Sequence, residues 1–238
     1  MRQQLFPSTE ELQRLGEIAL GEAPPDLVLT GGRYLNVYTG EFEEADIWLG
    51  GRFIAKLTGK KPPGGARTID VSGSVVVPGF IDGHIHVESS LLDPVNFSKS
   101  ALECGVTGIV TDFHEAGVTC GKEGLLAMKQ AFKETPLKSF WVTPTSLPFL
   151  PEIQSTVSSL SPEEALELLS EPETLGLSEV MGDKFTEMVR GGGGEDLKVL
   201  EKALLDRKLP EGHLFKTTGD ELDAMLGLGV SSDHEPRK

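Results

Sequence analysis

The sequence predicts an α/β protein in which a small β domain precedes a parallel sheet flanked by helices. Residues 26–72 contain four short apolar runs separated by Gly-Gly pairs, a pattern typical of antiparallel hairpins. From Ser74 onward, apolar runs alternate with amphipathic segments. This alternation indicates parallel strands joined by right-handed helical crossovers.

The N-terminal part is predicted to contain one helix and the β domain. Residues 8–21 favour a helix because Ser8 and Glu11 have capping-box spacing and apolar residues recur on one face. The expected strands are DLVLT, RYLNVY, ADIWLG and RFIAKL, with turns at Gly31-Gly32 and Gly50-Gly51. We therefore expect an N-terminal helical segment, a small β domain and a larger α/β part, at residues 1–22, 23–73 and 74–238.

The larger part is predicted to contain six strands with helices between them. Asp93-Pro94 is a typical helix start, and Ser161–Glu164 has the spacing of a second capping box. The glycine-rich segment 190–196 lacks the lysine and hydroxyl residue of a phosphate-binding loop and is predicted to be a flexible loop. The strands are expected near residues 77–81, 106–111, 139–143, 174–179, 211–214 and 228–232, and two of the helices near 122–133 and 195–207.

Composition excludes several classes of protein. The chain has 238 residues and 38% hydrophobic residues, enough for one ordinary core with a small appendage. Its net charge of −15 disfavours nucleic acid and anionic membranes as partners, whereas a small uncharged base or amide remains possible. No apolar stretch reaches the ~18 residues of a membrane helix. Cys104 and Cys120 do not form a disulfide framework, so we expect a cytoplasmic protein in which both pack in the interior.

Two histidines follow the first strand of the larger part. His84 and His86 lie in the segment PGFIDGHIHVESS, directly after an apolar run. Because side chains alternate along an extended strand, both imidazoles point the same way and can bind one metal ion together. A His-x-His pair also occurs on ordinary exposed strands, so this motif alone leaves both interpretations open.

The remaining histidines favour the metal interpretation. His114, His213 and His234 each follow a predicted strand, and none is expected on a helix. Glu179 has the same kind of position. In parallel barrels, functional side chains gather at the carboxyl ends of the strands. Imidazoles and a carboxylate together form a ligand set suited to divalent Mn, Fe or Zn.

These motifs carry a family resemblance. The segments HIHVESS, TDFHEAG, LGLSEVMGD, EGHLF and GVSSDHE, in this order, resemble the adenine deaminases of the amidohydrolase superfamily, and residues 24–57 resemble their β domain. The resemblance implies a distorted (β/α)8, TIM-like barrel with a small β-sandwich. With about six strands recognisable, the expected fold is a partial barrel preceded by the N-terminal half of that sandwich.

The resemblance also implies a reaction and residue roles. The reaction is the hydrolysis of adenine to hypoxanthine and ammonia, as in purine salvage, with two divalent ions. His84 and His86 would hold the more buried ion, Glu179 would bridge both ions through its two oxygens, and His213 and His234 would complete the set from the fifth and sixth strands. Glu179 and His213 are thus the expected catalytic residues within this chain. Substrate-binding or supporting positions are expected at Glu88, Ser89, His114, Glu115 and Asp233.

Some features depart from the family pattern. Phe113 and Leu214-Phe215 replace the family's usual residues and are expected to alter the pocket wall. The part from Ser74 onward is shorter than the ~250 residues of a whole barrel, so the family's general-base aspartate on the eighth strand has no predicted position. We therefore expect an incomplete barrel that needs a C-terminal partner chain or homo-oligomer, or else a non-catalytic chain.

A cyclic-amide hydrolase of dihydroorotase type is a further alternative. Such enzymes commonly bridge their metals with a modified lysine on the fourth strand. This chain has Glu179 at that position and no lysine nearer than Lys184, which favours the deaminase branch.

Overall fold

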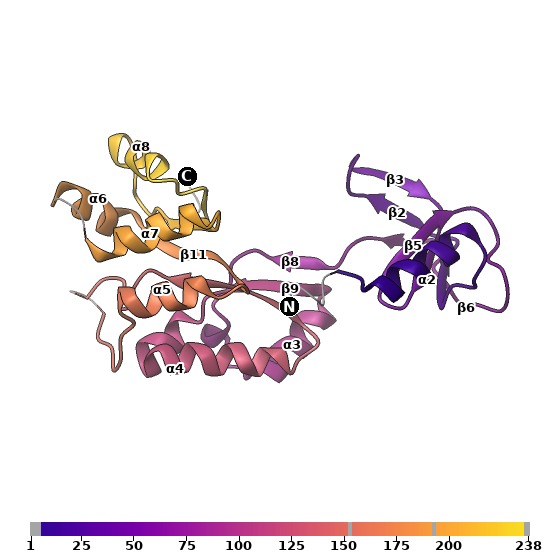
Figure 1. The fold of residues 1–238 in the computed structure, drawn as a ribbon, viewed down its shortest axis with the longest axis horizontal. Coiled ribbons are helices and arrows are strands. Elements are labelled where there is room, and N and C mark those ends of the chain that lie inside the picture. The colour runs from indigo at the N-terminus through magenta and orange to yellow at the C-terminus, as the bar shows by residue number, and fades with distance from the viewer. Residues whose placement is uncertain (1–5, 152–153, 192–193, 236–238) are drawn as a thin grey trace. The chain divides into compact units, whose positions relative to one another are not determined.

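The computed structural model describes residues 6–151, 154–191 and 194–235, and the chain separates into two compact units after Pro78. Figure 1 shows both units, which are described separately below.

The N-terminal unit begins with helix α2 (Thr9–Leu20), whose capping box forms as predicted between Ser8 and Glu11. Ile18 on this helix is fully buried and packs with Val28 and Trp48 of the adjacent sheet.

Seven strands of the N-terminal unit form two mixed sheets. They run in the orders β5-β4-β1-β6 and β3-β2-β7. Their bounds are β1 (Leu27–Thr30), β2 (Arg33–Asn36), β3 (Glu41–Glu44), β4 (Asp46–Gly50), β5 (Phe53–Thr58), β6 (Arg67–Asp70) and β7 (Val75–Val76).

One of the two predicted hairpins is confirmed and the other is wrong. The Gly50-Gly51 turn joins β4 to its antiparallel neighbour β5. The Gly31-Gly32 turn instead joins β1 to β2, which lie in different sheets. At this crossing the backbone lies so close to Ser72 and Val71 that a Cβ on either glycine would overlap them. The glycines therefore permit a close crossing between sheets rather than a hairpin.

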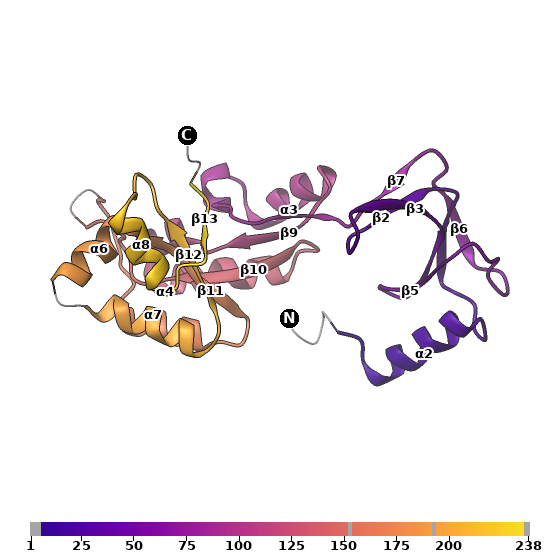
Figure 2. The ribbon, with the colours of Figure 1, turned by 90° about the horizontal axis from the view of Figure 1, so that it is seen from above.

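The second unit is a partial (β/α)8 barrel, as expected. Its six strands run in the order β13-β12-β11-β10-β9-β8, and every neighbouring pair is parallel. Strands β9 to β13 of this sheet are labelled in Figure 2. The strands are β8 (Phe80–Asp82), β9 (Val106–Thr111), β10 (Lys138–Pro144), β11 (Thr174–Met181), β12 (Leu209–His213) and β13 (Ser232–Asp233). The helical elements are η1 (Val87–Ser90), α3 (Pro94–Glu103), α4 (His114–Lys133), α5 (Pro162–Ser170), α6 (Gly182–Arg190), α7 (Glu195–Leu205) and α8 (Asp220–Gly227).

The helices differ from prediction at two places. Helix α4 begins at His114, so the expectation that no histidine lies on a helix is wrong. Gly121, with φ of 65°, interrupts α4, and the stretch after this kink matches the predicted helix 122–133. Helix α6 was not predicted, and the expected loop 190–196 includes residues 192–193, which lie outside the described residues.

The core of the second unit lies between the sheet and helices α3, α4, α5 and α7. Ile109, Leu125, Leu168 and Leu177 are completely or almost completely buried there. Cys104 and Cys120 are exposed free thiols, so the prediction that they pack in the interior is wrong: both stand at solvent-facing ends of helical segments. Among the described residues, no helix combines the length and apolar character needed to span a bilayer.

Candidate metal centre

The carboxyl ends of the parallel strands bring the predicted histidines together. His84 and His86 follow β8, and the backbone N–H of Ile85 between them donates to the carbonyl of Val110 at 3.1 Å. This bond continues the course of β8 beside β9, so the side chains of His84 and His86 leave the backbone on the same side. His213 ends β12, and His234 directly follows β13.

Glu179 reaches the cluster through an irregularity in β11. The register of β11 against β12 shifts between Leu177 and Val180, which is the signature of a β-bulge. Glu179 lies within this bulge with φ of 48°, a conformation that non-glycine residues rarely adopt. Its side chain is only 7% exposed. Such local strain is typical of functional sites, and here it accompanies a carboxylate aimed at the histidines.

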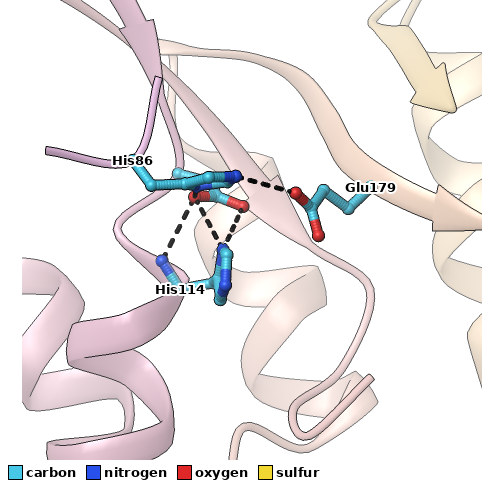
Figure 3. Close-up of side chains that lie close together, drawn as sticks. His86, His114 and Glu179 are labelled. Atoms are coloured by element: carbon cyan, nitrogen blue, oxygen red, sulfur yellow. Dashed lines mark hydrogen bonds and ion pairs between the residues drawn. The ribbon is translucent and has the colours of Figure 1, made fainter. Parts of the chain in front are cut away.

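Three side-chain atoms converge in what we call the A site. His84 Nε2 lies 3.0 Å from His86 Nε2, and Glu179 Oε1 lies 3.5 Å from the first and 3.0 Å from the second. Figure 3 shows the His86 ring directed at Glu179. Ligands bound at ~2.1 Å to one ion stand about 3.0 to 3.4 Å apart. The observed spacing therefore fits a shared divalent ion.

The same Glu179 oxygen borders a second group, which we call the B site. His213 Nδ1 lies 3.1 Å from His234 Nε2, and His234 Nε2 lies 3.9 Å from Glu179 Oε1. Glu235 Oε1 adds a carboxylate 3.6 Å from His213 Nδ1. Oε1 of Glu179 thus faces the histidines of both sites, whereas the expected bridge used both of its oxygens.

Two carboxylates that sequence reasoning missed lie beside these histidines. Asp112 is 1% exposed, accepts a hydrogen bond from Ser178 Oγ at 2.7 Å, and lies 3.5 Å from His86 Nδ1. Glu211 Oε1 lies 3.0 Å from His84 Nδ1. Glu211 stands two positions before His213 on β12, so the alternation argument applied to His84 and His86 also applies to it. It does not apply to Asp112, because the left-handed φ at Phe113 interrupts the extended chain before His114.

His114 and Phe113 occupy different environments. The His114 ring lies with its Nδ1 3.3 Å from Asp112 and its centroid 4.5 Å from that of His86 (Figure 3). The Phe113 side chain is 1% exposed and packs against Phe132 in the hydrophobic core. The prediction that Phe113 lines the pocket is therefore wrong, because the left-handed φ of 55° at this residue turns the chain into α4. Phe149, which was not predicted, contacts the His114 ring with centroids 5.2 Å apart.

The other predicted positions have defined partners. The side chain of Ser89 donates to Glu115, and Asp233 Oδ1 accepts from the backbone N–H of Leu214 at 3.1 Å. Glu88 Oε1 accepts from the backbone N–H of Ala116 at 3.2 Å. Burial raises the pKa of Glu88, whose Oε2 atom has no hydrogen-bond partner among the described residues.

Opposite charges offset burial throughout the ion-free cluster. Burial lowers the pKa of His84 and His86, but the carboxylates of Glu179, Glu211 and Asp112 outweigh it and raise these pKa values to about 9 and about 10. Burial raises the pKa of Glu179, but the two histidines outweigh it and hold the pKa at about 2. The neighbouring carboxylates therefore favour the protonated forms of His84 and His86 when no ion is bound.

The arrangement offers several ways to hold a cation. Besides the A-site trio of His84, His86 and Glu179, three groups of side chains within the described part of the chain have ligand atoms close enough for one ion. Glu179 and His234 each belong to two of these groups, so the ligand sets are contiguous. The groups are His86, Asp112, His114 and Glu179; His84, Glu211 and His234; and Glu179, His213 and His234.

Comparison with known proteins places the fold and the motifs in one family. The model of the amidohydrolase family matches residues 75–197, more than half of the chain. The chain belongs to the amidohydrolase family. The matched region begins at β7 and includes the A-site residues His84, His86 and Glu179.

Relatives of this amidohydrolase include adenine deaminases. It is 34% identical over 237 residues to adenine deaminase 2 of Rhizobium etli, covering 98% of this chain and 39% of that protein. It is 35% identical over 224 residues to adenine deaminase 2 of Carboxydothermus hydrogenoformans, covering 94% of this chain and 38% of that protein. The chain thus spans about two fifths of the length of these relatives.

Among solved structures, the amidohydrolase resembles an N-acyl-D-glutamate deacylase from Bordetella bronchiseptica, crystallised with zinc and a phosphonate inhibitor. The TM-score is 0.56 at 16% identity, covering 88% of this chain and 51% of that chain. At this identity the likeness concerns the fold alone, and it agrees with the partial barrel described above.

Proposed function

We propose that this amidohydrolase acts in the hydrolytic deamination of adenine, which yields hypoxanthine and ammonia, with two divalent ions. The convergence of His84 Nε2, His86 Nε2 and Glu179 Oε1 within 3.0 to 3.5 Å is the observation that carries the proposal. The similarity to proteins named adenine deaminases, which extends over 94–98% of this chain, supports the choice of substrate.

In this proposal the ligands divide between two sites that share one carboxylate. His84 and His86 would hold the ion at the A site, His213 and His234 would hold the ion at the B site, and Glu179 would be shared by both. Mn, Fe and Zn all accept such imidazole and carboxylate ligands. A divalent ion lowers the pKa of its bound water from 15.7 toward about 7 and thereby supplies hydroxide at neutral pH.

The side chains around the ligands orient them and the substrate. Glu211 Oε1 lies 3.0 Å from His84 Nδ1, within hydrogen-bond distance, and Asp112 Oδ1 lies 3.5 Å from His86 Nδ1. A carboxylate therefore faces the Nδ1 side of each ring, and with protons on Nδ1 the Nε2 lone pairs would be free for ions. The free oxygen of Glu88 is a candidate to contact a polar edge of the base, together with its neighbours Ser89 and Glu115.

The position of Lys184 disfavours a cyclic-amide hydrolase with a lysine bridge. Its Nζ atom donates to Ser146 Oγ at 2.6 Å and lies 3.0 Å from Asp196 Oδ1. This lysine is therefore already paired at the start of α6, whereas Glu179 occupies the bridging position.

The test is an ammonia-release assay on the metal-loaded chain. We expect adenine to release ammonia. Hydrolysis of dihydroorotate opens the ring to carbamoyl aspartate without releasing ammonia, so this compound is followed separately by its own loss and is expected to remain unhydrolysed. His86→Ala should abolish the activity together with metal binding. Turnover of dihydroorotate alone would support the cyclic-amide alternative. Stoichiometric metal binding without turnover of either compound would contradict catalysis by this chain alone and would support a metal-binding chain that requires a further polypeptide.

A further inference from the structure

The buried carboxylate of Glu211 stands beside two histidines that belong to different sites. Glu211 lies on β12, and its side chain is 14% exposed. Its Oε1 atom lies 3.0 Å from His84 Nδ1 and 3.4 Å from His234 Nδ1. His84 directs its other nitrogen to the A site, and His234 directs its other nitrogen to the B site.

The arrangement of the two rings disfavours an ion between them. The His84 and His234 rings are stacked with centroids 3.7 Å apart and planes inclined by 11°. An imidazole nitrogen binds a metal through a lone pair in the plane of its ring. Two nearly parallel rings separated in this way cannot both direct an in-plane lone pair at one ion ~2.1 Å away. A carboxylate, which accepts hydrogen bonds over a broader range of directions and distances, suits the position better.

Unpartnered polar atoms at this position point to the same conclusion. His234 Nδ1 and Glu211 Oε2 are both buried and have no hydrogen-bond partner among the described residues. A buried donor or acceptor without a partner is costly. A small rotation of the Glu211 carboxylate would allow it to accept from His84 and His234 together.

We propose that Glu211 is a positioning residue shared by both metal sites, which fixes His84 and His234 with protons on Nδ1 so that each offers Nε2 to its own ion. This inference rests on the ligand roles in the proposed function. The role proposed for Glu211 differs from that of Asp112. The imidazoles near Asp112, those of His86 and His114, belong together with Glu179 to a single group of ligands. Because one carboxylate supports ligands of both sites, its loss should weaken the binding of both ions.

The experiment compares zinc binding by the full chain and by Glu211→Gln, using a competing chromogenic chelator and metal analysis. Glutamine keeps the shape and an oxygen acceptor but removes the charge. We expect both zinc affinities to fall, each by about 10- to 100-fold, as is usual when a supporting carboxylate of a metal-bound histidine is lost. Glu201→Gln, an exposed position on α7, is the matched control and should bind as the unaltered chain does.

A second measurement on the unaltered chain does not depend on how the variant folds. With 15N-labelled histidines and zinc, long-range 1H–15N spectra report which ring nitrogen carries the proton, and the chain has only five histidines. We expect protons on Nδ1 of both His84 and His234. A proton on Nε2 of either residue would overturn the proposal.

The binding outcomes separate this inference from the function on which it rests. An unaltered chain that binds no zinc would contradict the proposed function and this inference together. If the unaltered chain binds zinc and Glu211→Gln binds both ions with the same affinities as the unaltered chain, only the role of Glu211 would be overturned. Loss of one ion with the other unchanged would also overturn it, since Glu211 would then serve a single site.

Discussion

Metal binding at the A site should depend strongly on pH, because ions and protons compete for the same nitrogens. In the ion-free protein, neighbouring carboxylates overcome burial and raise the pKa of His84 to about 9 and that of His86 to about 10. Metal ions bind the deprotonated imidazole. Raising the pH from 6 to 8 should therefore strengthen binding throughout that interval.

The geometry bounds the size of this effect. The two Nε2 atoms lie 3.0 Å apart and can share one proton between them, so an arriving ion displaces at least one proton and at most two. Each displaced proton contributes about 1.4 kcal/mol, or a factor of ten in affinity, per pH unit. We therefore expect the affinity for the A-site ion to rise by about 10- to 100-fold for each unit of pH.

Isothermal titration calorimetry measures this competition directly. Titrating zinc into the metal-free chain in buffers of different ionisation enthalpy gives the number of protons released, and repeating the titration across the pH interval gives the slope. Release of one to two protons for the A-site ion is expected. Binding that is independent of pH and releases no protons would refute the placement of the ion between these nitrogens.

Three further predictions concern single residues. His84→Ala or His86→Ala should reduce the number of ions bound, as measured by elemental analysis, and full stoichiometry in either variant would contradict the ligand assignment. Glu179→Gln should weaken ions at both sites while leaving the far-ultraviolet circular dichroism spectrum unchanged; loss of one site alone would argue against a bridge. Leu177→Ala should lower the free energy of unfolding by about 2–5 kcal/mol, measured by urea titration, because this side chain is fully buried in the core. A smaller loss would indicate that neighbouring side chains fill the cavity left by the shorter residue.

Most strands of the barrel could be predicted because their apolar runs are short and bounded by clear helix signals, but the strand expected near 228–232 overlaps β13 only at Ser232. Ser161 and Asp93 form the predicted caps, and the strand expected at 106–111 matches β9. The sheets of the N-terminal unit were harder to predict. Gly-Gly at positions 31–32 has the composition of a hairpin turn, but the tertiary contacts of Ser72 and Val71 decide its path.

The histidines of the site could be predicted from their positions at strand ends, whereas several supporting groups could not. Glu179 was expected at the site, but the bulge and the left-handed backbone conformation that bring it there leave no local sequence signal in LGLSEVM. Asp112 and Glu211 were not predicted. The kink at Gly121 joins two helical segments, so the start of α4 at His114 also escaped prediction.

A recurring pattern links the local sequence to the way the cluster is built. An acidic residue stands two positions before a histidine in DGH, DFH and EGH, at the ends of β8, β9 and β12. In the first two, Asp82 and Asp112 each accept from the backbone N–H of the following histidine at 3.2 Å and shape the local turn. Glu211, in the third, is one methylene longer and instead reaches His84, 127 residues away in the sequence. The same spacing thus produces a local turn with aspartate, although Asp112 also accepts from Ser178 on β11, whereas the polar contacts of the Glu211 side chain with described residues are those with distant histidines. Shortening Glu211 to aspartate should therefore remove support from the histidines of both sites even though the charge is retained.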